Sequence, residues 1–186
     1  HLEARGHSVV PQPWQSGVTA LEHVDLVVHR SQWDYHYDIA AYREWLSDLG
    51  HVGARVVNPV ELVTWNLSKS YLFDLARTGV DVPAMAELGP DDDLRPALES
   101  LGLTRAVVKP MTGASGHLVE LVDIYDTERW NIETRSQRAH GSWLVQELVP
   151  EVTTHGEISL VYTGSSFSHA IRKVPQAGEF RVNSRF

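Results

Sequence analysis

The sequence predicts an α/β region followed by an α+β region, and three observations support this prediction. Up to about residue 60, short valine-rich runs alternate with a helical pattern, which is typical of a parallel sheet with helical connections. Between residues 66 and 102, leucines recur at helical spacing. From Arg105 onward, β-branched runs follow one another with glycine-containing turns between them, which indicates a series of strands.

The composition excludes several classes of protein. The 186 residues include 16 Lys and Arg against 24 Asp and Glu, and the net charge of −8 argues against a broad nucleic-acid or anionic-membrane surface. No apolar run approaches the ~18 residues of a membrane span. Without cysteine, the chain forms no disulfide, thiolate zinc site or cysteine nucleophile. The histidines include no helical pair at i, i+4 with a Glu between, so we expect no zinc-protease site.

The first region, residues 1–60, contains the elements of a parallel sheet. We expect short strands at 8–10, 24–28 and 56–57, and a helix that Asp38 caps and Gly50 closes. The strand at 24–28 ends in a polar, aromatic loop at 29–35. Because parallel sheets bind ligands at the carboxyl ends of their strands, this loop is a candidate ligand site.

In the second region, residues 61–186, we expect helices before strands. One helix begins at Asn66, with Lys69 in its first turn, and another begins among residues 91–93. Strands are expected at 105–110, 117–122 and 142–149, with a hairpin of 156–162 and 166–172, while 125–141 is either a helix or a loop. The ends read as a helix stopping at Gly6 and a strand running into Phe186, so we expect a longer protein and infer nothing from the missing signal peptide.

Two lysines stand near a glycine-rich loop. Lys109 ends a β-branched strand and precedes residues 111–116, which contain Gly113, Ser115 and Gly116. Glycines allow backbone N–H groups to converge on an anion, and a lysine at the strand end supplies the opposite charge. An ordinary hairpin with an exposed lysine explains the same pattern. Lys69 is unfavourable at a helix N-terminus unless an anion binds nearby, or it is a solvated surface residue.

Charged residues also gather in the last strands. Arg172, Lys173 and Arg181 suit a transferring phosphoryl group or a carboxylate, or salt bridges on the strand faces. Glu147 and Glu157 are expected to be half-buried on their strands, where each needs a partner such as a ribose hydroxyl or an arginine.

Taken in order, these segments resemble the ATP-grasp superfamily. The similarity is to its glutathione-synthetase-like branch and, within that, to small ligases of the D-cycloserine-forming type. Each motif is weak alone, but the ordered set is specific and covers most of residues 58–186. The motifs are Asn58-Pro59, residues 65–72, Val108-Lys109-Pro110 with 113–116, 146–150, 156–160, 168–173 and 178–183. Residues 30–35 resemble the substrate-side loop of the preceding domain in that branch.

The resemblance implies a site for each group. Lys69 and Lys109 would contact ATP phosphates, with the loop at 111–116 folded over them. Gln146, Glu147 and Leu148 would hold adenine, with Glu157 also at the nucleotide. Arg172 and Arg181 would stabilise the phosphoryl group in flight. The substrate would meet Arg30, Ser31, Trp33, Asp34 and Tyr35.

The resemblance also implies an activity. A pre-ATP-grasp domain at residues 1–60 would precede an incomplete ATP-grasp core at 61–186, in a cytoplasmic, ADP-forming carboxylate–amine ligase that uses ATP and magnesium. Its partners would be a small acyl substrate and an amine, neither nucleic acid nor membrane, and a homo-oligomer is left open. The metal ligands of the family lie beyond this chain, so no residue is assigned to magnesium and this piece alone is expected to be inactive. The alternatives are an amino-acid or peptide ligase with another acceptor, an ATP-binding module without turnover, and an acidic structural domain.

Overall fold

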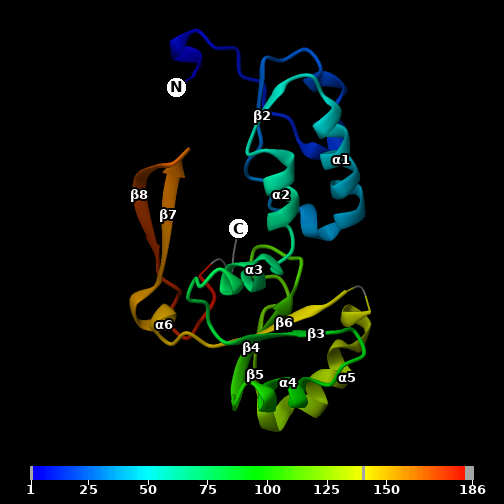
Figure 1. Cartoon of the computed structure of the whole chain (residues 1–186), viewed down its shortest axis with the longest axis vertical. Coiled ribbons are helices and arrows are strands. Elements are labelled where there is room, and N and C mark those ends of the chain that lie inside the picture. The colour runs from blue at the N-terminus through cyan, green and yellow to red at the C-terminus, as the bar shows by residue number, and fades with distance from the viewer. Residues whose placement is uncertain (1, 140, 183–186) are drawn as a thin grey trace. The chain divides into compact units, whose positions relative to one another are not determined.

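The computed structural model describes residues 2–139 and 141–182, and the chain divides into two compact units at residues 1–67 and 68–186 (Figure 1). The expected domain division between residues 60 and 61 stays a prediction. No helix in the described residues is both long and apolar enough to cross a bilayer.

The first unit contains a two-stranded parallel sheet and two α-helices. The strands β1 (Leu26–Val28) and β2 (Arg55–Val57) pair in parallel, with Val27 opposite Val56, which confirms the expected parallel arrangement. The helix α1 (Ile39–His51) begins where the Asp38 carboxylate accepts a hydrogen bond from the Ala41 amide at 3.0 Å, also as expected. The remaining helical elements are η1 (Glu3–Arg5), η2 (Trp14–Ser16), η3 (Thr19–Leu21), η4 (Tyr35–Tyr37) and α2 (Val60–Asn66).

Aromatic side chains dominate the core of this unit. Tyr42 stacks on Trp45 at 5.6 Å between ring centroids and meets Trp14 edge-on at 5.1 Å. Leu46 and Leu49 of α1 complete the buried face of the helix. The helical spacing of these residues along α1 is therefore what closes the unit.

The second unit is built on a four-stranded antiparallel sheet with the strand order β3-β6-β4-β5. The helices α4 (Leu94–Ser100) and α5 (Thr127–Arg138) lie together on one face of it, and the hydrophobic core fills the space between (Figure 1). The strands are β3 (Met85–Leu88), β4 (Arg105–Pro110), β5 (Glu120–Asp123) and β6 (Trp143–Glu147). The other elements are α3 (Tyr71–Arg77), η5 (Ile124–Asp126) and α6 (Glu151–His155).

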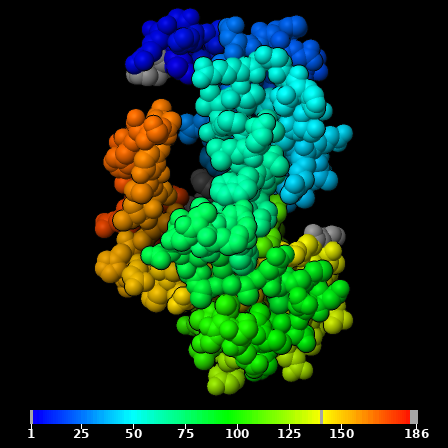
Figure 2. Space-filling model, viewed as in Figure 1, coloured from blue at the N-terminus to red at the C-terminus, as the bar shows by residue number. Residues whose placement is uncertain are grey.

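A separate hairpin follows this sheet. The strands β7 (Glu157–Thr163) and β8 (Ser166–Lys173) pair antiparallel around a short turn, as expected, and Glu157 lies opposite Lys173. In Figure 2 the hairpin stands out as a narrow orange ridge. Its apolar side chains remain largely exposed, for example Ile158 at 63% and Leu160 at 58%.

The expected helix starting at Asn66 is wrong. Asn66 ends α2, and α3 begins five residues later at Tyr71. The break lies at Lys69, whose backbone N–H donates to the Met111 carbonyl at 2.8 Å. In a helix that continued from α2, the Lys69 N–H would donate to the carbonyl of Trp65, so its bond to Met111 accompanies the break between α2 and α3.

Four smaller expectations also differ. Residues 8–10 form no strand, the strand expected from 117 begins only at Glu120, and residues 180–182 are not a strand, while 183–186 lie outside the described residues. Glu147 is exposed rather than half-buried, because it is the last residue of β6, where the strand leaves the sheet. Residues 127–138 are the helix α5, which settles the open alternative for 125–141.

Candidate functional site

Lys69 and Lys109 lie next to each other at the start of the glycine-rich loop. The Lys69 ammonium donates to the carbonyls of Pro110 at 2.9 Å and Gly113 at 3.1 Å. Burial, together with repulsion from the charge of Lys109, lowers the pKa of Lys69 to about 8. Two cations held this close in a partly dehydrated place form a site that favours an anion.

Lys109 connects the sheet to the hairpin. Its ammonium donates to the Gln146 side-chain oxygen at 2.5 Å, across the pair of strands β4 and β6. Burial lowers the pKa of Lys109, and the negative charge of Glu157 acts in the opposite direction. Sheet and hairpin therefore contribute charges to one place.

Glu157 is half-buried, as expected, and contacts the third lysine. Lys173 donates to the Glu157 carboxylate at 3.2 Å, and the Ser159 hydroxyl donates to it at 3.4 Å. The chain contains three lysines in all, and all three lie in this connected set of residues. Every other fixed cation is an arginine, so the compact ammonium group is concentrated at this site.

The glycine-rich loop is fixed at its start and turns sharply afterwards. Met111 is 7% exposed, and its backbone N–H donates to the Ser142 carbonyl at 3.0 Å. Ser115 and Gly116 both have positive φ, at 56° and 71°, and the His117 amide donates to the Ala114 carbonyl at 3.0 Å. Such a turn exposes backbone N–H groups, which bind phosphate oxygens in many proteins.

Several predicted residues are not joined to the lysines. Arg172 is exposed and lies opposite Ile158, so it points to the other face of the hairpin from the Glu157–Lys173 pair. Arg181 pairs with Glu179 at 2.6 Å, and this hydrogen bond holds the pKa of Glu179 at about 2. Glu147 accepts a hydrogen bond from the Ala84 amide at 3.3 Å, and Leu148 follows β6 as a half-buried residue.

The first unit contains a cavity of about 320 Å³ at the loop after β1. Of the predicted substrate residues, Arg30, Ser31, Trp33 and Asp34 line this cavity, together with Gln12, Pro13, Trp14, Gln15 and Gln32. Segment 12–15 was missed by the sequence reasoning, and its only signal was a tryptophan between two glutamines.

Segment 12–15 binds Asp34 directly. The Trp14 indole donates to one carboxylate oxygen at 2.9 Å and the Gln15 amide to the other at 2.6 Å. The bond from Trp14 is the main reason that the pKa of Asp34 is lowered. Tyr35 stacks on Tyr42 at 5.3 Å and so packs against the core instead of lining the cavity.

The base of this loop contains a buried polar pair that the sequence did not indicate. The His29 Nε2 atom lies 2.6 Å from the Tyr42 hydroxyl, and burial lowers the pKa of His29. The Asn58 side chain donates to the His29 carbonyl at 2.7 Å from a left-handed backbone position with φ of 60°. These contacts fix the direction in which the chain leaves β1.

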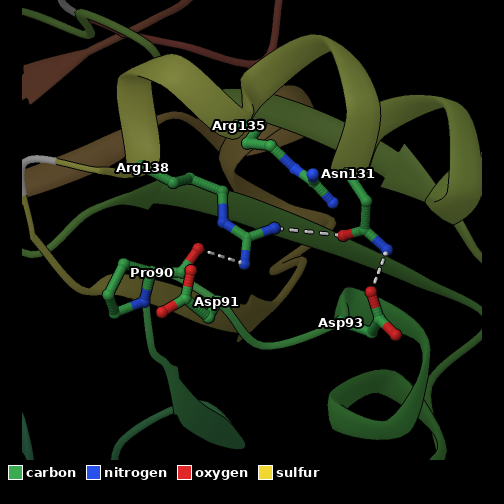
Figure 3. Close-up of a pocket in the computed structure, with 6 residues that line it drawn as sticks. All are labelled: Pro90, Asp91, Asp93, Asn131, Arg135 and Arg138. Carbon is green, nitrogen blue, oxygen red and sulfur yellow. Dashed lines mark hydrogen bonds between the residues drawn. The ribbon is translucent and has the colours of Figure 1, made fainter.

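A second cavity, of about 200 Å³, lies between α5 and the loop before α4 (Figure 3). Its buried cation, Arg138, donates to the Asn131 side chain at 3.1 Å and to the carbonyls of Gly89 and Pro90 at 3.1 and 3.0 Å. Asn131 in turn donates to Asp93 at 3.1 Å. The chain's own oxygens thus use this guanidinium, which ties α5 to the loop.

Comparisons with known proteins identify the class of protein that this fold and site define. Residues 93–186 match the ATP-grasp domain of prokaryotic glutathione synthetase, and residues 1–58 match the N-terminal domain of D-cycloserine synthetase DcsG. The chain belongs to the ATP-grasp family, which confirms the resemblance and the predicted fold class.

One relative is similar along most of the chain. The cycloserine biosynthesis protein DcsG of Streptomyces lavendulae is 31% identical over 166 residues, which are 86% of this chain and 55% of the relative. The crystal structure of D-cycloserine synthetase DcsG superposes with a TM-score of 0.77 at 29% identity, covering 87% of this chain and 56% of that one. The chain thus spans just over half the length of these relatives.

Two more distant structures share the fold alone. The RimK domain ATP-grasp protein of Sphaerobacter thermophilus has a TM-score of 0.68 at 23% identity, covering 92% of this chain and 65% of its own. The D-alanine–D-alanine ligase of Bacillus anthracis has a TM-score of 0.56 at 15% identity, covering 93% and 62%. Neither bears on the substrate.

Proposed function

We propose that this protein is an ADP-forming ligase that binds ATP at the lysine site of the second unit. It transfers the terminal phosphoryl group to a small carboxylate or similar oxyanion, and an amine then displaces phosphate to form a C–N bond. The proposal is supported chiefly by Lys69 and Lys109, two partly buried cations beside a glycine-rich loop in a family that binds ATP.

The residues around the lysines would have separate roles. Positive charge at Lys69 and Lys109 would offset the charge of the phosphates, and the turn at 113–116, with Gly113, Ser115 and Gly116, would cover them. The charge of Glu157 acts on Lys109. The Glu157 carboxylate could therefore orient the Lys109 ammonium or accept a hydrogen bond from a ribose hydroxyl. Gln146, Glu147 and Leu148, at the end of β6, would hold the adenine.

Arg172 and Arg181 are proposed to stabilise the phosphoryl group during transfer. Charge spreads over the phosphoryl oxygens in the transition state, and a planar guanidinium binds two of them at once. Arg172 is exposed and Arg181 contacts Glu179. We therefore expect the two guanidinium groups to contact the phosphoryl group only after ATP has bound.

The cavity of the first unit is proposed to bind the acid. Arg30 is the cation among the residues that line it, and Ser31 and Trp33 add a hydroxyl and an exposed aromatic face. Asp34 and Tyr35 would set the shape of the loop, because Trp14 and Gln15 donate hydrogen bonds to Asp34 and Tyr35 packs on Tyr42. The similarity to the D-cycloserine synthetase DcsG supports a small acyl substrate, and an amino-acid or peptide ligase with a different acceptor is the alternative.

Magnesium is expected to accompany ATP. Among the described residues, no group of three or more His, Asp or Glu side chains is placed to hold a metal ion. We therefore assign no ligand to the metal and no step to it.

Release of ADP and phosphate by the full-length protein tests the proposal, because this piece alone is expected to be inactive. Turnover should require ATP, a small carboxylate or similar oxyanion and an amine together. ATP binding without any turnover across a panel of acids and amines would favour the second candidate, a nucleotide-binding module. Absence of ATP binding would overturn both.

Point variants locate the roles. Lys109→Ala should weaken ATP binding by at least about tenfold, because a hydrogen bond to a charged group contributes about 1.5–3 kcal/mol. Arg77→Ala is the matched control, since its side chain is 72% exposed on α3.

Arg30→Ala should raise KM for the acid alone, and Arg172→Lys should lower kcat about tenfold with little change in ATP binding.

A further inference from the structure

The Lys69 side chain is directed at the glycine-rich loop itself. Its ammonium lies 2.9 Å from the Pro110 carbonyl, 3.1 Å from that of Gly113 and 3.5 Å from that of Met111. An ammonium group has three N–H donors, so these three carbonyls can occupy all of them. The backbone N–H of Lys69 adds a fourth contact, to the Met111 carbonyl at 2.8 Å.

The three carbonyls converge on one point because the chain bends around the ammonium. Convergent carbonyl dipoles repel one another unless a donor lies between them, and a buried carbonyl that loses its donor costs about 1–3 kcal/mol. The ammonium is therefore what permits residues 110–113 to curve inward. The loop turns out of the sheet at this curve, just before residues 114–116.

Lys109 differs from Lys69 in its partners although it is equally shielded. It donates to the Gln146 side chain and responds to Glu157, both of which are side chains that can move. A bound phosphate can replace a mobile side-chain amide at little cost, whereas it can replace the Lys69 partners only by reshaping the loop backbone.

We propose that Lys69 is a positioning residue, which holds the carbonyls of residues 110–113 and thereby sets the path of the glycine-rich loop. This role is additional to the proposed part of Lys69 in the ATP site, on which it rests, and it concerns a contact within the protein. Lys69 influences the nucleotide through its charge and through the loop.

Hydrogen exchange of the loop amides, measured on the protein without nucleotide, tests the proposal. Lys69→Met removes the donors and keeps an unbranched side chain only one atom shorter, and we expect exchange of residues 111–117 to become at least tenfold faster. Lys109→Met is the matched control, since it removes the same charge from the neighbouring position. It should leave the exchange of the loop amides unchanged while weakening ATP binding. Equal exchange in Lys69→Met and the unmodified protein, or equal acceleration in both variants, would overturn the proposal.

A second measurement needs no substitution. With three lysines in the chain, a spectrum of ¹⁵N-labelled lysine side chains contains three ammonium signals. The Lys69 ammonium protons should exchange with water at least tenfold more slowly than those of Lys173, whose pair with Glu157 is partly exposed. Equally fast exchange would refute the loop contact. Failure of ATP to bind would instead refute the proposed function and leave both loop measurements interpretable.

Discussion

The two units connect their cores to their candidate sites in opposite ways. In the first unit, Trp14 belongs to the aromatic core, lines the cavity and donates to Asp34, while core residue Tyr42 contacts His29 at the base of the loop. In the second unit, the sheet separates the two functions. Ala106 and Val108 belong to the core, whereas Lys109, at the alternate position of β4, contacts the site.

This difference predicts how substitutions behave in each unit. Where one side chain packs the core and shapes the site, stability and binding change together. Where alternate residues of a strand divide these tasks, the two properties change separately.

The largest expected effect is loss of stability alone, in the second unit. Leu98 is fully buried in α4, and Leu98→Ala should lower the free energy of unfolding by about 3 kcal/mol through lost burial and the cavity left behind. ATP affinity below the unfolding transition should not change. Urea unfolding measures the first quantity and calorimetric titration the second, with the 58%-exposed Leu160→Ala as control. A parallel loss of ATP affinity would contradict the separation of core and site in the second unit.

In the first unit, Tyr42→Phe should change both properties. It removes the hydroxyl 2.6 Å from His29 Nε2 and leaves a buried polar atom without this partner, at a cost of about 2 kcal/mol. Amides of residues 30–35 should exchange faster, and KM for the acid should rise. Tyr125→Phe, at a position 85% exposed, is the control. A stability loss with an unchanged loop would contradict the shared role.

Lys69 makes stability depend on pH. Because its pKa falls from 10.5 to about 8 on folding, the folded state disfavours the charged form. The resulting penalty is complete below pH 8 and is relieved as the pH rises toward 10.5. The unmodified protein should therefore gain roughly 1 kcal/mol relative to Lys69→Met between pH 8 and 9. Identical pH profiles of the free energy of unfolding in the two proteins would mean that the Lys69 ammonium is solvated in the folded state.

The smallest expected effect concerns the hairpin. The Lys173–Glu157 pair has side chains 34% and 43% exposed, so water and salt screen it. Lys173→Met should cost about 0.5 kcal/mol of stability, and less at high salt. A loss above about 2 kcal/mol would contradict this prediction and would mean that unfolding of the hairpin is coupled to unfolding of the four-stranded sheet.

The sequence predicted the elements whose evidence is local. Asp38 marks the start of α1, the valine runs mark β1, β2 and β4, and the turn at 163–165 marks the hairpin. The helix break at Lys69 could not be predicted, because it depends on the carbonyl of Met111, more than forty residues away along the chain. β3 was missed because Met85 to Leu88 includes no β-branched residue.

The candidate site follows the same pattern. The ordered motifs pointed to Lys69, Lys109, Gln146 and Glu157, and the structure joins them through charge and hydrogen bonds. The contacts of Asp34 with Trp14 and Gln15 are tertiary and left no periodic signal. The opposite faces of Arg172 and Lys173 depended on the register of the hairpin, which residue spacing alone does not determine.

The attachment of Lys69 to residues 110–113 has an evolutionary consequence. The lysine and the loop are separated by more than forty residues, and any substitution that changes the backbone path of the loop would move the carbonyls that the Lys69 ammonium contacts. A substitution at position 69 should be tolerated chiefly in combination with changes in the loop, which makes the two segments a single heritable unit. Random libraries that vary both segments together should therefore yield functional pairs that neither single library contains.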